Sequence, residues 1–265
     1  MEPKPPRQRL VPSTNEAGPI RVGASDSFDP ELLVSVRDIE EAETAVSAGV
    51  SIVDFKEPSR GALAACDPKV WNEAAKQFAA AMPEDRHIRL SAALGESDSG
   101  PELGSLVPPE FSFAKVGPSG CSTAQKLSSL WGSIRLPQSV ELVPVAYADH
   151  VASGTICPEQ VLELVIKSGQ RRMLVDTFIK DGRTLIDHFA IEQMRSLVSM
   201  AHCHGVWLAM AGSIRLREMQ SLVTTGVRPD CWGVRGDVCD HRDRSGRLDP
   251  ERIGLWQNAM ALQAS

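Results

Sequence analysis

Two ionisable side chains end a short apolar run early in the sequence. Asp54 and Lys56 follow Ile52 at intervals of two residues, and residues two apart in a β-strand lie on the same face. If Val53 and Phe55 pack outward against helices, the carboxylate and the amine point into whatever the strand encloses. Charges in an apolar enclosure are costly unless they are paired or used in chemistry. This face is therefore the first candidate for a catalytic site.

Three later apolar runs also place ionisable or polar side chains at intervals of two residues near their ends. A lysine near other cations and partly removed from water has a lowered pKa and can attack a carbonyl carbon, while neighbouring carboxylates transfer protons. The combination predicts Schiff-base chemistry. The alternative is that each lysine merely reaches solvent and pairs with an adjacent aspartate. The residues expected to converge are Asp54, Lys56, Lys115, Tyr147, Asp149, Asp176 and Lys180.

Apolar runs that read as strands alternate with segments of helical periodicity, an order typical of parallel α/β proteins. An open doubly wound sheet is the alternative, but no glycine-rich turn of the dinucleotide-binding type follows the first strand. We therefore predict an α/β fold with a single (β/α)8 TIM barrel, a catalytic domain over residues 29–265 whose strand ends converge on the active site. The predicted strands cover 32–36, 52–58, 90–95, 113–117, 141–149, 173–178, 206–212 and 231–236, and the helices cover 39–49, 67–82, 122–131, 158–169, 185–204, 215–225 and a last segment from 249, with at most a short helix in 96–109.

Composition limits the classes of partner. Lysine and arginine number 28 against 34 aspartate and glutamate, a net charge of −6, so we expect no nucleic-acid surface. No apolar run approaches the roughly 20 residues that cross a bilayer, so we expect no membrane contact. Residues 1–28 are rich in Pro, Ser, Arg and Gly without the apolar core of an export signal, and we expect a disordered, flexible tail.

The six cysteines are scattered and none forms a CxxC pair, which favours reduced thiols in a cytoplasmic protein. His202 and His204 flank Cys203 at a predicted helix end beside Gly205. This position favours a helix cap over a metal ligand set. We therefore expect no metal.

The loops after the last two strands suggest a phosphate site. Gly212 and Ser213 follow the seventh predicted strand, while Arg235 and Gly236 end the eighth. In TIM barrels these loops commonly bind phosphate through backbone N–H groups, and glycine lets the backbone approach an anion closely. Ordinary turn glycines are the alternative. We expect these four residues to bind the phosphate of a substrate.

Seven ordered motifs carry a family resemblance: LLVS, IVDFKEP, AKVG, YAD, LVDTFIKDG, LAMAGSI and GVRG. Together, over residues 32–248, they resemble the (5-formylfuran-3-yl)methyl phosphate synthase family of methanofuran-type cofactor biosynthesis. The resemblance implies a (β/α)8 barrel that condenses two molecules of glyceraldehyde 3-phosphate into a furan aldehyde phosphate with loss of phosphate and water. It implies no external cofactor. By this resemblance, Lys56 forms the Schiff base and Asp54 is the carboxylate associated with it. Lys115 matches the family's second strand-end lysine, and Asp176 and Lys180 match its later aspartate and lysine.

Two other functions fit the same residues. One is a class I aldolase-like Schiff-base lyase on phosphosugars, which would stop at a linear product. The other is a non-catalytic phosphosugar-binding barrel, for which a phosphate site alone would suffice. The expected partner is in each case a small phosphorylated molecule, and assembly into a homo-oligomer is left open.

Overall fold

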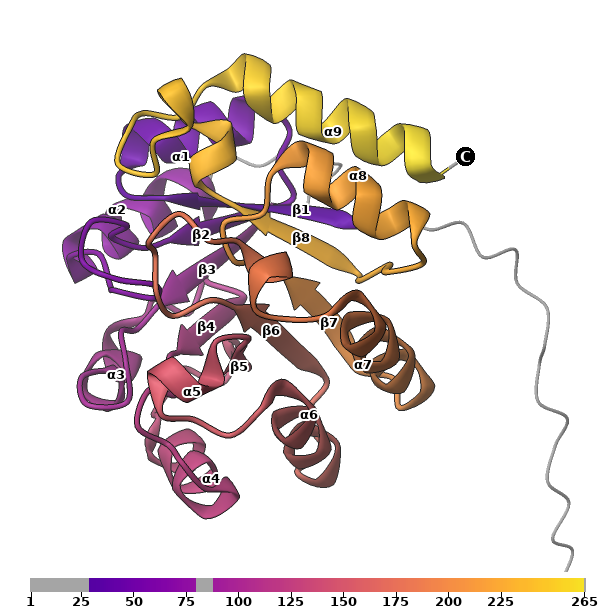
Figure 1. The fold of residues 1–265 in the computed structure, drawn as a ribbon. Coiled ribbons are helices and arrows are strands. Elements are labelled where there is room, and N and C mark those ends of the chain that lie inside the picture. The colour runs from indigo at the N-terminus through magenta and orange to yellow at the C-terminus, as the bar shows by residue number, and fades with distance from the viewer. Residues whose placement is uncertain (1–28, 80–87, 265) are drawn as a thin grey trace, which may run out of the picture.

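β-Strands and α-helices alternate along the computed structural model, which describes residues 29–79 and 88–264 (Figure 1). The tail 1–28 and the predicted end of the second helix at Met82 lie outside these residues. The strands are β1 Glu31–Val36, β2 Ile52–Phe55, β3 Arg89–Ala93, β4 Phe113–Val116, β5 Glu141–Tyr147, β6 Arg172–Asp176, β7 Trp207–Met210 and β8 Cys231–Val234. The helices are α1 Ile39–Ser47, α2 Pro68–Ala79, α3 Gly100–Leu103, α4 Ala124–Ser133, α5 His150–Ser153, α6 Pro158–Lys167, α7 Ile191–Cys203, α8 Leu216–Thr224 and α9 Pro250–Ala264.

All eight strands pair in parallel with their neighbours in sequence order. The sheet closes because β1 pairs with β8, Glu31 opposite Cys231, as well as with β2, where Ser35 lies opposite Asp54. A closed parallel sheet with helices on its outer side is a (β/α)8 TIM barrel. The fold predicted from the sequence is confirmed.

Alternation along each strand divides the buried residues into two cores. Val53 and Phe55 belong to the larger core between strands and helices, whereas Ile52 belongs to a smaller core inside the barrel. Tyr147 also lies in this inner core, at 0% exposure. The strand period of two therefore points Asp54 and Lys56 toward the barrel axis, as the sequence predicts.

Local capping and packing position the helices around the barrel. The Asp38 side chain accepts the Glu41 N–H at 2.9 Å and so caps α1. Proline opens α2, α6 and α9, where the missing N–H would have no helical partner. The last helix, α9, lies against α8 and α1 beside the closing strands (Figure 1). No helix in the two described ranges is long and apolar enough to cross a membrane.

The structure corrects one helix and refines another. The predicted helix 185–204 is interrupted: Leu185–Asp187 forms a 3-10 turn and α7 begins only at Ile191. The cause is that the Leu185 N–H donates to Gly212 O at 2.8 Å, which ties the turn to the end of β7. The doubtful segment 96–109 contains the four-residue α3, as expected, while the equally short α5 was not predicted.

A buried ion pair joins the first helix to the end of the last strand. Arg235 donates both terminal nitrogens to the Glu41 carboxylate, one of them at 3.0 Å, and Glu41 is 2% exposed. Arg37 donates its backbone and side-chain N–H groups to the same carboxylate at 3.0 and 3.2 Å. We call these three side chains the closure cluster. Because a buried charge without its partner is strongly destabilising, the cluster ties the two ends of the barrel together.

We expect Glu41→Gln to lower the free energy of unfolding by about 3–5 kcal/mol, because it leaves the buried Arg235 guanidinium unpaired. Urea unfolding followed by circular dichroism measures this. The control is Glu40→Gln, whose exposed carboxylate binds Arg247 at 2.7 Å on the surface. Equal losses in the two variants would contradict a structural role for the closure cluster.

Candidate active site

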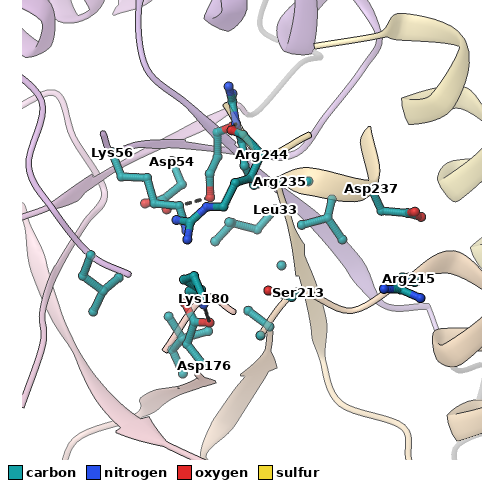
Figure 2. Close-up of a pocket in the computed structure, with 18 of the residues that line it drawn as sticks. Leu33, Asp54, Lys56, Asp176, Lys180, Ser213, Arg215, Arg235, Asp237 and Arg244 are labelled. Carbon is teal, nitrogen blue, oxygen red and sulfur yellow. Dashed lines mark hydrogen bonds and ion pairs between the residues drawn. The ribbon is translucent and has the colours of Figure 1, made fainter. Parts of the chain in front are cut away.

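A cavity of about 260 Å³ opens at the carboxyl ends of the strands. Its wall is built by residues from β1, β2, β4, β6 and the loops after β7 and β8. Figure 2 shows Lys56 and Asp54 at one side of this cavity, with Asp176 and Lys180 facing them from β6 and the loop that follows it. The predicted site residues that line it are Asp54, Lys56, Lys115, Asp176, Lys180, Gly212, Ser213, Arg235 and Gly236.

Two lysine–aspartate ion pairs fix the positions of the charges. Lys115 Nζ lies 2.6 Å from Asp54 Oδ1, and both side chains are at most 3% exposed. Lys180 Nζ lies 2.7 Å from Asp176 Oδ1, which also accepts the Thr177 N–H at 2.7 Å. Such charge-assisted contacts hold both partners in one geometry. The alternative in which the lysines reach solvent is wrong for Lys115, which is buried.

Lys56 is the exception. Its backbone N–H donates to Val36 O at 2.8 Å and its residue is 8% exposed, yet its ammonium forms no hydrogen bond or ion pair within the described ranges. Burial lowers the pKa of Lys56 to about 8, with Asp176 and Asp54 opposing and Lys180 and Lys115 adding to the shift. A lysine poised near neutral pH carries a usable fraction of nucleophilic amine.

Both aspartates have cationic partners that offset the cost of their burial. Burial alone would raise the pKa of Asp176, but Lys180 and Lys56 outweigh it and hold the pKa below its usual value. The Asp54 carboxylate is completed by Ser35 Oγ, which donates to Oδ2 at 3.3 Å. Asp176 Oδ2, in contrast, accepts no hydrogen bond from the described residues. That oxygen is free to accept a proton.

The loops after β7 and β8 contribute Gly212, Ser213 and Gly236 to the cavity wall. Gly212 and Ser213 both have positive φ, +105° and +57°, and a Cβ on Gly212 would lie 3.0 Å from Thr177 Cγ2. The N–H groups of Gly212, Ser213 and Gly236 donate to no acceptor in the described parts of the chain. Unused N–H groups at a cavity wall suit an anion.

Arg235 needs a correction. We expected its side chain to bind phosphate, but its guanidinium donates to Glu41, Ser35 O, Arg244 O and Gly246 O. These contacts use all five of its N–H donors. The side chain therefore has a structural role, and an anion can contact this residue only through its backbone.

Tyr147 and Asp149 also differ from the expectation, because neither lines the cavity. The Tyr147 hydroxyl donates to Glu96 Oε1 at 2.6 Å, and burial, followed by the Glu96 charge, raises its pKa well above the usual value. Asp149 accepts the N–H groups of Phe178 and Ile179 at 2.6 and 2.8 Å. A catalytic role for either residue stays a prediction that this geometry does not support.

Two residues near the site were not predicted from the sequence: Glu96, which binds Tyr147, and Arg244, which lines the cavity. Glu96 follows β3 and also accepts the Ser119 N–H at 3.2 Å; a Cβ on Gly117 would fall 2.1 Å from its carboxylate. Arg244, in the loop after β8, lines the cavity beside Lys56. Both lie in loops without periodicity, and only the three arginines within 242–247 mark the second.

His202 and His204, for which the sequence favours a helix cap over a metal site, do not line the cavity. His202 Nε2 is 3.2 Å from Asp230 Oδ2, near Trp207 at the amino ends of the strands. No group of three His, Cys, Asp or Glu residues within 29–79 and 88–264 is arranged to hold a metal ion.

The fold and the cavity define a TIM-barrel protein with its ionisable groups at the carboxyl ends of the strands, where such barrels carry out their chemistry. The family model described as 4-HFC-P synthase matches residues 32–257. The chain belongs to this family, which confirms the family predicted from the sequence motifs.

Named relatives agree with this assignment. The (5-formylfuran-3-yl)methyl phosphate synthase of Methanococcus maripaludis strain C5 is 32% identical over 234 residues, which cover 84% of this chain and 95% of the relative. The protein of the same name from Archaeoglobus fulgidus is 31% identical over 238 residues, covering 84% and 96%. A putative synthase from Streptomyces griseus is 32% identical over 247 residues, covering 88% and 95%.

Solved structures support the fold. KGPDC from Streptococcus mutans, in complex with D-R5P, superposes with a TM-score of 0.58 at 12% identity, covering 88% of this chain and 98% of that one. Phosphoribosyl anthranilate isomerase from Thermococcus kodakaraensis gives a TM-score of 0.55 at 15% identity, covering 87% and 98%. At these identities the likeness concerns the barrel alone.

We expect acylation of Lys56 by acetic anhydride, followed by peptide mass spectrometry, to rise with pH and level off above about pH 8. A free lysine side chain would instead keep rising toward a pKa of about 10.4. Asp176→Asn removes an anion and should move the midpoint to lower pH, whereas Lys180→Gln removes a cation and should move it to higher pH. One midpoint shared by all three proteins would contradict this electrostatic account.

Proposed function

We propose that this chain condenses two molecules of glyceraldehyde 3-phosphate into (5-formylfuran-3-yl)methyl phosphate through a Schiff base on Lys56. The observation that carries the proposal is the buried, unpaired amine of Lys56 between two lysine–aspartate ion pairs. The names of the relatives supply the product. An enzyme of this kind serves the biosynthesis of methanofuran-type cofactors.

The first half of the reaction follows from the positions of the charges. Lys56 Nζ adds to the carbonyl carbon of one triose phosphate, and the carbinolamine loses water to leave an iminium. Asp176 Oδ2, which has no protein donor in the described chain, takes the proton from the carbon next to the iminium carbon. The electron pair of that C–H bond forms the enamine.

The second half joins the two substrates. The enamine carbon attacks the second triose phosphate, and Lys115 and Lys180 protonate the departing oxygens or hold their charge. The N–H groups of Gly212, Ser213 and Gly236 bind a phosphate at the cavity wall. Water then adds to the iminium carbon and the C–N bond breaks, which releases the aldehyde and returns the Lys56 amine. Overall, two triose phosphates give the furan aldehyde phosphate, one inorganic phosphate and two waters. Since carbon undergoes no net oxidation or reduction, no redox cofactor is required.

We place the reaction in the cytoplasm. The six cysteines are free thiols, and five of them are buried or partly buried. Free thiols are the usual state in reducing compartments, and small phosphorylated trioses are substrates that dissolve in water.

The direct test is borohydride reduction in the presence of glyceraldehyde 3-phosphate, followed by peptide mass mapping. We expect a reduced adduct on Lys56 and none in Lys56→Ala, because among the three lysines that line the cavity only Lys56 has no ion-pair partner. Lys167, which is on the surface and 73% exposed, provides the matched control through Lys167→Ala, which should label normally. An unlabelled Lys56 would overturn the Schiff base.

Product analysis separates the related functions. Turnover should generate the ultraviolet absorbance of a furan aldehyde, and Asp176→Asn should lower kcat by roughly 10²–10⁴-fold, the usual contribution of a general base. A linear product with the adduct still formed would indicate an aldolase-like lyase. Binding without turnover, unaffected by Lys56→Ala, would indicate a phosphosugar-binding barrel.

A further inference from the structure

Arg244 reaches across the cavity mouth from the loop that follows β8. One terminal nitrogen donates to Gly61 O at 3.0 Å, in the loop that follows β2. The same side chain lines the cavity with Lys56. Figure 2 shows Arg244 on the side of Lys56 and Asp54, while Ser213 lies across the cavity. The Arg244 side chain therefore shares the cavity wall with Lys56.

The charge of Arg244 has no carboxylate partner among the described residues, although the side chain is half-buried. Four other arginines of this corner have one: Arg37 and Arg235 bind Glu41, Arg242 lies 3.3 Å from Asp237, and Arg247 binds Glu40. Burial lowers the pKa of Arg244 while the charge of Asp176 acts against the shift. A half-buried cation facing a cavity is compensated when an anion binds there.

The backbone under Arg244 is held firmly. Its carbonyl oxygen accepts Arg235 Nε at 3.0 Å, and Arg235 and Arg37 both donate to Gly246 O, at 2.8 and 2.7 Å. The closure cluster thus fixes the segment from which Arg244 projects. A guanidinium on a fixed backbone loses little freedom when it binds, which favours bidentate contact with phosphate.

The proposed condensation brings two phosphorylated molecules into one cavity, and their phosphates repel each other unless each has its own cationic or N–H partner. The N–H groups of Gly212 and Ser213 provide one such place. The Arg244 side chain lies across the cavity from Ser213, between the loops after β2 and β8, and next to Gly236, where a Cβ would lie 3.5 Å from Arg244 Cβ.

We propose that Arg244 forms a second phosphate subsite, so that the cavity binds one phosphate at Gly212 and Ser213 on the β7 loop and the other at the Arg244 guanidinium. This inference rests on the proposed function, because the proposed reaction requires the cavity to bind two phosphates. Its test uses binding alone and therefore does not depend on turnover.

The probes are two acyclic sugar alcohols without a carbonyl group, a hexitol 1,6-bisphosphate and the corresponding hexitol 6-phosphate. Calorimetry compares their affinities for the wild-type chain, Arg244→Gln, Arg244→Lys and the control Arg247→Gln, an exposed arginine of the same loop. In the wild type and the control, the second phosphate should improve affinity by roughly 10–150-fold, which corresponds to about 1.5–3 kcal/mol for a hydrogen bond to a charged group. Arg244→Gln should abolish this advantage, and Arg244→Lys should restore part of it.

Three results would overturn the subsite: an equal advantage in Arg244→Gln and the wild type, no advantage in the wild type, or failure of both alcohols to bind. Thermal unfolding of each variant checks that the fold is retained, and Arg244→Lys keeps the test valid if the glutamine variant unfolds. If the affinities follow the expectation while borohydride traps no adduct on Lys56, the subsite stands and the proposed reaction fails.

Discussion

Three lysines and two aspartates share one water-poor end of the barrel, and this imbalance of charge governs the site. Each aspartate binds one lysine, Asp54 with Lys115 and Asp176 with Lys180. Only Lys56 is left without a carboxylate of its own, so the cost of burial falls on its charged form. The same geometry that immobilises four charges thus lowers the pKa of the fifth group.

Barrel closure provides the enclosure on which this imbalance depends. In a closed parallel sheet every strand delivers its inward side chains to one mouth, so β2, β4 and β6 contribute charges that are far apart in sequence. The cavity does not occupy the whole mouth. On the side of β3 and β5, the mouth is filled by Tyr147, Glu96 and Phe178. The ring centroids of Phe178 and Tyr147 are 5.3 Å apart, and the Tyr147 hydroxyl donates to Glu96. The cavity is confined to the other side, next to the loops after β7 and β8.

Much of this architecture was predictable because strands have a period of two. The alternation around Lys56 and Lys115 gave the direction of both side chains, and the alternation of strands and helices gave the barrel. Direction does not identify a partner, however. Arg235 points inward as expected, but its partner Glu41 lies 194 residues away on α1. No local pattern reports such a distant pairing.

Residues carried by loops were harder still. Glu96 and Arg244 lie in segments whose backbone follows tertiary contacts, so no period places them at the mouth. Tyr147 was predicted to join the lysines because it ends a strand, yet its length carries the hydroxyl to Glu96. The helix break after Leu185 likewise depends on Gly212, which is distant in sequence. Periodicity predicts the scaffold, whereas long-range hydrogen bonds decide which side chains remain available.

The closure cluster has a consequence for the order in which the protein acquires reactivity during synthesis. A chain emerges from the ribosome with its amino-terminal segments first, so Lys56 and Glu41 exist long before Arg235. Until β8 docks against β1, the wall that removes water from Lys56 is incomplete. An amine in water stays protonated near neutral pH. The lowered pKa of Lys56 therefore appears only when the barrel is complete.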